Sequence, residues 1–206
     1  MLFDYHVHAA AHGEYKYEYG WLKLFLEKAH QQGIAEIGFT EHDEFVQLID
    51  HEAVAGLREE YPGISIRLGL EVDFIPGREP KIAVLRQRHP WDFLTGSVHY
   101  IDGWGFDHPD YRHLFADKDC DRVYGEYFNL VNSMASSGLF DVVGHLDLVK
   151  IWGHRPRRQS ALEFARPVLR SIKASGMAIE INSAGLRKPV REIYPSQEII
   201  DTMFAM

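Results

Sequence analysis

The chain has 206 residues, a formal net charge of -8 at pH 7 and a single cysteine, Cys120. This length favours one domain, and 46% hydrophobic with 25% charged residues excludes disorder on composition. The negative charge argues against general binding to nucleic acid or anionic membranes, which need a basic surface. A lone cysteine excludes an internal disulfide, and no apolar run approaches membrane-spanning length, so we expect a cytoplasmic protein.

The first predicted strand, residues 2–8, carries two histidines on one face. His6 and His8 are two positions apart, so their side chains point the same way, about 6.6 Å apart along the strand. Two imidazoles at this spacing can converge on one metal ion, and His12 follows in a short loop. Taken alone, the segment also fits an incidental pair of histidines on a strand.

Strands and helices alternate along the rest of the chain. Apolar spacing predicts helices over residues 21–32, 45–60, 81–88, 121–137, 162–172 and 197–206. Further strands are predicted over residues 34–40, 64–71, 93–99, 141–145 and 178–182. Residues 100–119 are predicted to be a long polar and aromatic loop that covers the site. Such alternation implies an α/β fold with parallel strands and functional groups at their carboxyl ends.

Potential metal ligands recur where the predicted strands end. In chain order these residues are His6 and His8, His42, Glu71, His99, His145, and Glu180 with Asn182. One of them could be a core histidine, but the whole set is hard to explain that way. Nitrogen and oxygen donors without a thiolate set suit zinc, manganese or iron.

The motifs around these residues resemble the PHP superfamily and, within it, the histidinol-phosphate phosphatases. The matching stretches are 4–8 (DYHVH), 40–42 (TEH), 69–71 (GLE), 96–99 (GSVH), 144–148 (GHLDL) and 180–182 (EIN). Residues 185–189 (GLRKP) with Glu192 and 194–196 (YPS) resemble the phosphatase branch in particular. The likeness covers nearly the whole chain, and its ordered motif set is far more specific than the first histidine pair.

The resemblance implies a distorted (β/α)7 PHP barrel that holds two or three divalent metal ions, Zn, Mn or Fe. It further implies that His6 and His8 hold one metal, which Glu71 bridges to a second. His99 and His145 would complete the second site, and His42 with His12 would hold the third.

The sequence departs from the family at its end. The family has a seventh strand with an Asp-x-His motif, and the chain stops at Met206 without a counterpart. We therefore expect a single PHP domain over residues 1–206 that lacks its seventh strand. The chain could be part of a longer protein, or a neighbouring subunit of a homo-oligomer could close the gap. Asp102, His108 or His113 could also substitute as ligands.

The activity implied is hydrolysis of L-histidinol phosphate, a step of histidine biosynthesis, by attack of metal-bound hydroxide. Glu71 and His99 would serve catalysis through the metals, and the guanidinium groups of Arg155, Arg158 and Arg187 are candidates for binding phosphate. Carboxylates could pair with the substrate ammonium, and loop aromatics could pack on its imidazole; the candidates are Glu180, Glu192, Trp104 and Phe106. The expected partner is a small phosphate monoester, with no nucleic acid and no membrane.

Three other functions remain open. Another PHP phosphoesterase, acting on nucleotides, would use the same metal ligands. An amidohydrolase would usually need a lysine at a strand end, which no predicted strand supplies. An inactive scaffold would bind metal without turnover.

Overall fold

The computed structural model describes residues 2–206, which divide into two compact units. Unit 1 comprises residues 2–72 and 86–95, and unit 2 comprises residues 73–85 and 96–206. The prediction of a single domain over the whole chain stays a prediction.

Six strands are joined in the order β1-β2-β3-β4-β7-β8, and this confirms the six predicted strands and the α/β class. Their bounds are Leu2–Val7 (β1), Ile34–His42 (β2), Ser65–Asp73 (β3), Phe93–Ser97 (β4), Val142–Val143 (β7) and Ala178–Ile179 (β8). The α-helices are Tyr19–Gln31 (α1), His51–Glu60 (α2), Glu79–Arg88 (α3), Cys120–Ser136 (α4), Ala161–Ser175 (α5) and Gln197–Ala205 (α6). Within residues 2–206, no helix has the length and apolar character needed to cross a membrane.

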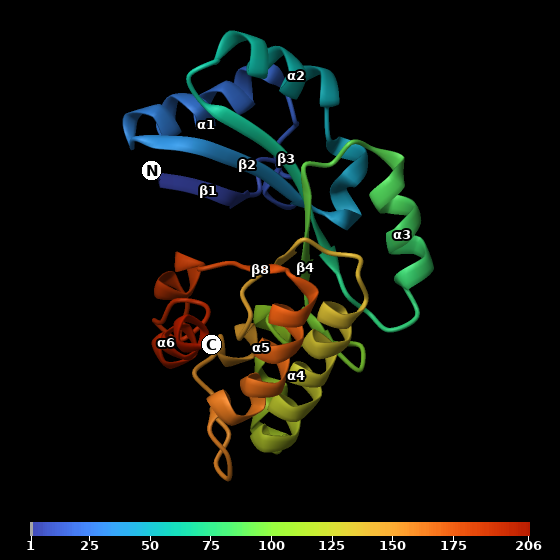
Figure 1. The fold of residues 1–206 in the computed structure, drawn as a ribbon, viewed down its shortest axis with the longest axis vertical. Coiled ribbons are helices and arrows are strands. Elements are labelled where there is room, and N and C mark those ends of the chain that lie inside the picture. Colours follow the sequence, from blue (N-terminus) through green and yellow to red (C-terminus); the bar gives the residue numbers. More distant parts are fainter. Residues whose placement is uncertain (1) are drawn as a thin grey trace. The chain divides into compact units, whose positions relative to one another are not determined.

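Unit 1 is built on three parallel strands. β2 pairs in parallel with β1 on one side and β3 on the other, and the second pairing aligns His42 with Glu71. Helices α1 and α2 lie on the same face of these strands (Figure 1). They bury their apolar stripes, with Leu22 and Leu26 on α1 and Val54 and Leu57 on α2. The register therefore fixes which side chains meet where β2 and β3 end.

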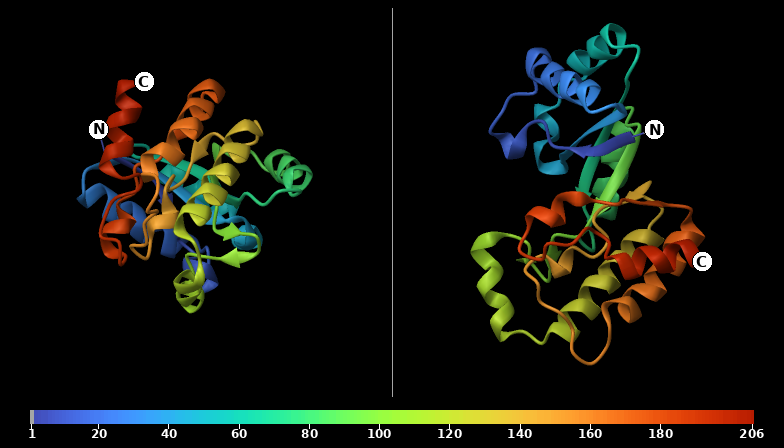
Figure 2. Two further views of the ribbon diagram at one scale, coloured as in Figure 1. Left: turned by 90° about the horizontal axis from the view of Figure 1, so that it is seen from below. Right: turned by 90° about the vertical axis from the view of Figure 1, so that its left-hand side faces the viewer.

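Unit 2 packs helices against the short strands β7 and β8. These strands are parallel, and the Gly144 N–H donates to the Gly96 carbonyl at the end of β4 (3.0 Å). Helices α4 and α5 lie side by side (Figures 1 and 2), each with a buried apolar stripe. A capping box between Ser160 and Glu163 begins α5, and Gly176, with φ 73°, ends it.

The structure changes two expectations about local structure. The predicted helix over 45–60 is a 3-10 helix, Asp43–Leu48 (η2), followed by α2, which starts where the Asp50 carboxylate accepts the Ala53 N–H (2.9 Å). The segment 100–119, predicted to be a long loop, contains short regular elements, and its role as a cover of the site stays a prediction. That segment forms an antiparallel pair, Tyr100–Ile101 (β5) and Trp104–Gly105 (β6), and a 3-10 helix, Pro109–Asp117 (η3).

The β5–β6 turn has a clear cause in the sequence. Asp102 and Gly103 both have positive φ, 50° and 76°, as the two central residues of a type I′ hairpin turn require. An Asp-Gly pair between short apolar stretches is a hairpin signal that the sequence analysis missed.

Glycine at position 69 makes room for an aromatic ring. A Cβ at Gly69 would lie 2.5 Å from the Phe93 ring, closer than real Cβ contacts come. We expect Gly69→Ala to lower the free energy of unfolding by about 1–3 kcal/mol, because this side chain overfills the packed surface of β3. Denaturant titration would measure the loss. Gly20→Ala on α1, with nothing within 4 Å of its Cβ, is the matched control and should be neutral or stabilising.

Candidate metal centre

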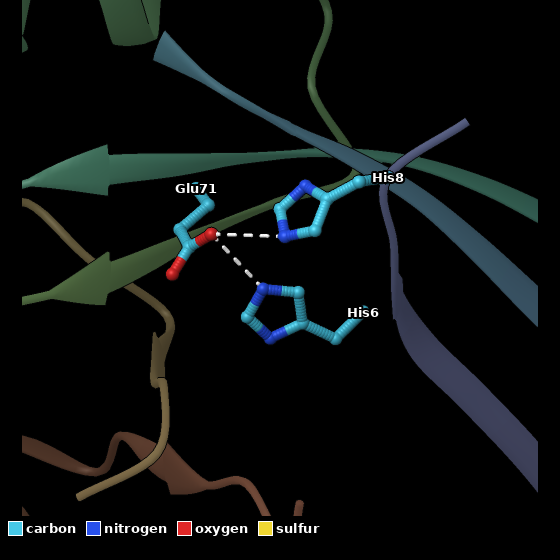
Figure 3. A group of neighbouring side chains, drawn as sticks. All are labelled: His6, His8 and Glu71. Atoms are coloured by element: carbon cyan, nitrogen blue, oxygen red, sulfur yellow. Dashed lines mark hydrogen bonds and ion pairs between the residues drawn. The ribbon is translucent and has the colours of Figure 1, made fainter. Parts of the chain in front are cut away.

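Three imidazoles surround one carboxylate oxygen in unit 1. The Glu71 Oε2 atom lies 3.0 Å from His6 Nε2, 3.3 Å from His8 Nε2 and 3.2 Å from His42 Nδ1. Figure 3 shows His6 and His8 turned toward Glu71. The Glu71 side chain is only 1% exposed, so its charge lies among neighbours rather than in water. His6, His8 and Glu71 offer nitrogen and oxygen donors that lie within 4.8 Å of one another, within reach of one cation.

The strands of unit 1 bring these residues together. His6 lies in β1 and His8 directly follows its last residue, Val7; the two rings lie 4.9 Å apart. His42 ends β2 in register with Glu71 on β3. The period of two along a strand and the parallel register thus account for this group of ligands.

His12 joins the same cluster from the 3-10 helix Ala11–Gly13 (η1), where its backbone is left-handed with φ 61°. Its ring stacks with that of His42 at 5.3 Å and lies 6.0 Å from that of His8. The His8 and His42 rings stack at 4.5 Å. The structure therefore gathers the predicted unit 1 ligands in one place; their roles as ligands stay a prediction.

A buried carboxylate behind His8 was missed by sequence reasoning. Glu41 Oε1 accepts the Ala10 N–H (2.9 Å), and Glu41 Oε2 lies 4.0 Å from His8 Nδ1. Burial raises the pKa of the Glu41 carboxyl. A carboxylate on the far nitrogen of a ligating histidine orients the ring and raises its basicity. The signal lay in the motif itself, where a glutamate directly precedes His42 in a buried strand.

The donor set fits a divalent metal. Glu41 Oε2 and His8 Nδ1, which have no hydrogen-bond partner among residues 2–206, face each other at 4.0 Å on the side of His8 away from Glu71, so that Nε2 is the ring nitrogen left for a cation. Imidazole and carboxylate donors without thiolates suit Zn, Mn or Fe.

The two remaining predicted histidine ligands meet in unit 2. The His99 and His145 rings lie 5.1 Å apart. His99 Nδ1 is hydrogen-bonded to the Asp73 carboxylate, an orienting contact that the sequence analysis missed. The His145 N–H donates to Glu180 Oε2 (2.8 Å), so Glu180 already holds the backbone at this histidine.

The three candidate arginines have different surroundings. Arg155 Nη2 donates to Glu192 Oε1 (2.7 Å), and Arg155 lines a pocket of about 280 Å³ with Tyr124, Asp147 and Lys150. Arg158 is paired with the carboxylates of Asp119 and Asp121, and Arg187 is exposed at the end of the 3-10 helix Ser183–Arg187 (η5). Of the three, Arg155 is the one whose guanidinium lines this pocket.

Other candidate residues take local or core positions. Phe106 is fully buried and packs its ring edge against Tyr127, so its predicted contact with a substrate ring is wrong. His108 Nδ1 accepts the Asp110 N–H, and His113 Nδ1 lies 2.9 Å from the Asp110 carbonyl. Both histidines thus have partners within their own 3-10 helix.

The loop that carries Arg155, Arg157 and Arg158 is held by the start of α4. The Asp121 carboxylate accepts the N–H groups of Arg157, Arg158 and Gln159 at 2.9, 2.8 and 3.2 Å. These bonds, together with Arg158, hold the pKa of Asp121 below its usual range. The Tyr124 hydroxyl donates to the His154 carbonyl (2.8 Å), so α4 fixes the loop on both sides of Arg155.

Comparison with known proteins identifies relatives along nearly the whole chain. The model of the PHP domain matches residues 4–184. A Deinococcus radiodurans protein named "Probable histidinol-phosphatase" is 33% identical, covering 97% of this chain and 80% of that protein. A histidinol-phosphatase from Bacillus subtilis is 29% identical, covering 81% of this chain and 75% of its own.

A solved structure has the same fold. Histidinol phosphate phosphatase from Lactococcus lactis, in complex with zinc, L-histidinol and phosphate, superposes with a TM-score of 0.73 at 20% identity. The match covers 99% of this chain and 80% of that chain. At this identity the likeness concerns the fold, and it agrees with the predicted PHP fold class.

Removing the central carboxylate should weaken metal binding. We expect Glu71→Gln to lower the affinity of the chain for zinc at least about tenfold, because even outer partners of metal ligands have effects of this size. Titration against a competing chelator would measure it. His30→Ala, which removes an exposed histidine of α1, is the control and should leave zinc binding unchanged; equal losses in both variants would contradict the assignment.

The Asp121 contacts predict a pH-dependent effect on stability. Because the pKa of Asp121 is lowered in the folded chain, its stabilising effect is present above the unfolded pKa of about 3.9 and is lost at lower pH. Asp121→Asn should therefore lower the Tm at pH 7, and the difference from the original chain should shrink below about pH 4. Thermal melts across this range would test it. Asp117→Asn, at an exposed position of η3, should show no such trend.

Proposed function

We propose that this chain, which belongs to the PHP domain family, hydrolyses L-histidinol phosphate to L-histidinol and inorganic phosphate. The observation that carries the proposal is the buried Glu71 carboxylate with three imidazole nitrogens within 3.3 Å of one oxygen. The named histidinol-phosphatase relatives supply the substrate.

Two or three divalent ions, Zn, Mn or Fe, complete the proposal. His6, His8 and Glu71 would hold the first, His99 and His145 the second, and His12 with His42 the third. Such ions, when bound, offset charge on phosphoryl oxygens and lower the pKa of bound water toward neutral pH. Glu41 and Asp73 would orient His8 and His99, respectively, by contacts at Nδ1.

Arg155 is our choice for binding the substrate phosphate. A guanidinium has five donors in a planar fork that fits phosphate oxygens. Nη2 donates to Glu192 Oε1 (2.7 Å) and Nη1 to the His154 carbonyl (3.3 Å), which leaves further N–H groups for phosphate. Arg158 is less suited because two carboxylates already pair with it. Arg187 has an exposed side chain, and no observation favours it over Arg155.

Two acidic residues were candidates for the substrate ammonium. Glu180 already accepts the His145 N–H and the Asn182 side-chain amide (3.0 Å). Glu192 is exposed and lines the pocket beside Arg155. We therefore favour Glu192 for contact with the amino group, although Arg155 shares its carboxylate.

The decisive test is phosphate release from L-histidinol phosphate by the purified chain supplied with manganese or zinc. We expect turnover that His99→Ala abolishes to background, and Arg155→Lys should raise KM more than it lowers kcat, because Lys cannot contact phosphate with two parallel donors.

Two outcomes would contradict the proposal. A folded chain that binds metal and releases no more phosphate than His99→Ala would support an inactive scaffold. Faster release from a nucleotide monophosphate than from L-histidinol phosphate would support a different PHP phosphoesterase.

A further inference from the structure

A buried lysine of unit 2 has no role in the proposed hydrolysis. Lys150, at the end of the 3-10 helix Leu148–Lys150 (η4), has a side chain only 3% exposed. Its ammonium lies 2.8 Å from Asp147 Oδ2 and 3.3 Å from Glu192 Oε2, and it donates to the Ile193 carbonyl (2.7 Å). Three acceptors match the three donors of an ammonium group.

The contacts of Lys150 and Asp147 also hold the segment 192–196 in place. Asp147 Oδ2, besides pairing with Lys150, accepts the Ser196 N–H (2.9 Å). Between these contacts lies Tyr194, a buried residue whose ring is 5.3 Å from the Lys150 ammonium. Tyr194 also exchanges two backbone hydrogen bonds with Asn182. The Lys150–Asp147 pair therefore holds this segment near both of its ends.

Glu192 connects this buried pair to the proposed phosphate-binding arginine. Its Oε2 faces Lys150 at 3.3 Å, and its Oε1 accepts from Arg155 Nη2 at 2.7 Å. Asp147 balances the charge of Lys150, and Lys150 takes Glu192 Oε2, so only Oε1 is left for Arg155. The guanidinium is thus held in place by one oxygen and keeps further N–H donors for an anion.

We infer that Lys150 is a positioning residue, which presents the Arg155 guanidinium to the substrate phosphate through Glu192. The inference rests on the proposed function. A buried ion pair is often replaceable by apolar residues without loss of stability, so stability alone is a weak reason for a lysine here. A flexible arginine loses side-chain freedom on binding phosphate, and a guanidinium held beforehand loses less.

The test is a double-mutant cycle on steady-state kinetics with the metal-supplied chain. Lys150→Met is combined with Asp147→Asn, so that no unpaired charge is left buried. We expect this pair of changes to raise KM for L-histidinol phosphate about three- to tenfold, with kcat little changed. With Arg155→Lys already present, the same changes should raise KM less than about twofold, because the group they position is gone.

A purely structural role gives a different result. In that case the paired changes would raise KM by the same factor in both backgrounds, and this outcome would overturn the inference. Lys28→Met, at an exposed position on α1, is the control for loss of a lysine charge and should leave both parameters unchanged. Lys150→Arg, which keeps the charge, should restore part of the affinity.

Glu192→Gln tests the inference even if the variants with buried substitutions fail to fold, because Glu192 is exposed. We expect it to raise KM more in the original chain than in the Arg155→Lys background, where only its proposed contact with the substrate amino group is lost. An unchanged or lower KM would show that Glu192 only competes with the substrate, and would overturn the inference.

Failure of the proposed function would be visible separately, as absence of turnover in the original chain. The same cycle would then be measured on the Kd of inorganic phosphate. Additive effects there would overturn the inference independently.

Discussion

The structure depends on one buried charge, the Glu71 carboxylate. A carboxylate withdrawn from water is costly unless cationic or hydrogen-bonding partners surround it. Here three imidazoles converge on a single oxygen, and this arrangement requires β1, β2 and β3 to keep their parallel register. A slip of one residue along β3 would turn Glu71 to the opposite face. The site and the register of unit 1 are therefore one constraint.

Carboxylates behind histidines repeat in both units. Glu41 lies near His8 Nδ1 in unit 1, and Asp73 contacts His99 Nδ1 in unit 2. In each case the acid comes from a different strand or strand end than its histidine, so ring orientation depends on the sheet rather than on local sequence.

The sequence predicts well what depends on period and register. His6 and His8 alternate along a strand, and the glutamate and histidines at strand ends gather as parallel topology requires. It predicts poorly what depends on partners far along the chain. In the sequence, Lys150 stands between apolar residues. Only its contacts with the distant segment 192–196 show why a charged residue is buried there. The hairpin at 102–103 was predictable from its Asp-Gly pair.

Arg155 and Arg158 illustrate the same limit, because two arginines three residues apart look equivalent in sequence. Asp119 and Asp121 bind Arg158 to the start of α4, whereas Arg155 faces a carboxylate that Lys150 also attracts. Whether a guanidinium can bind phosphate thus depends on how many carboxylates pair with it and on whether those carboxylates also pair with another cation. In a protein of net charge -8, a phosphate monoester needs a cation with donors left for its oxygens. Lys150 takes one oxygen of the shared carboxylate, so that only the other oxygen faces Arg155.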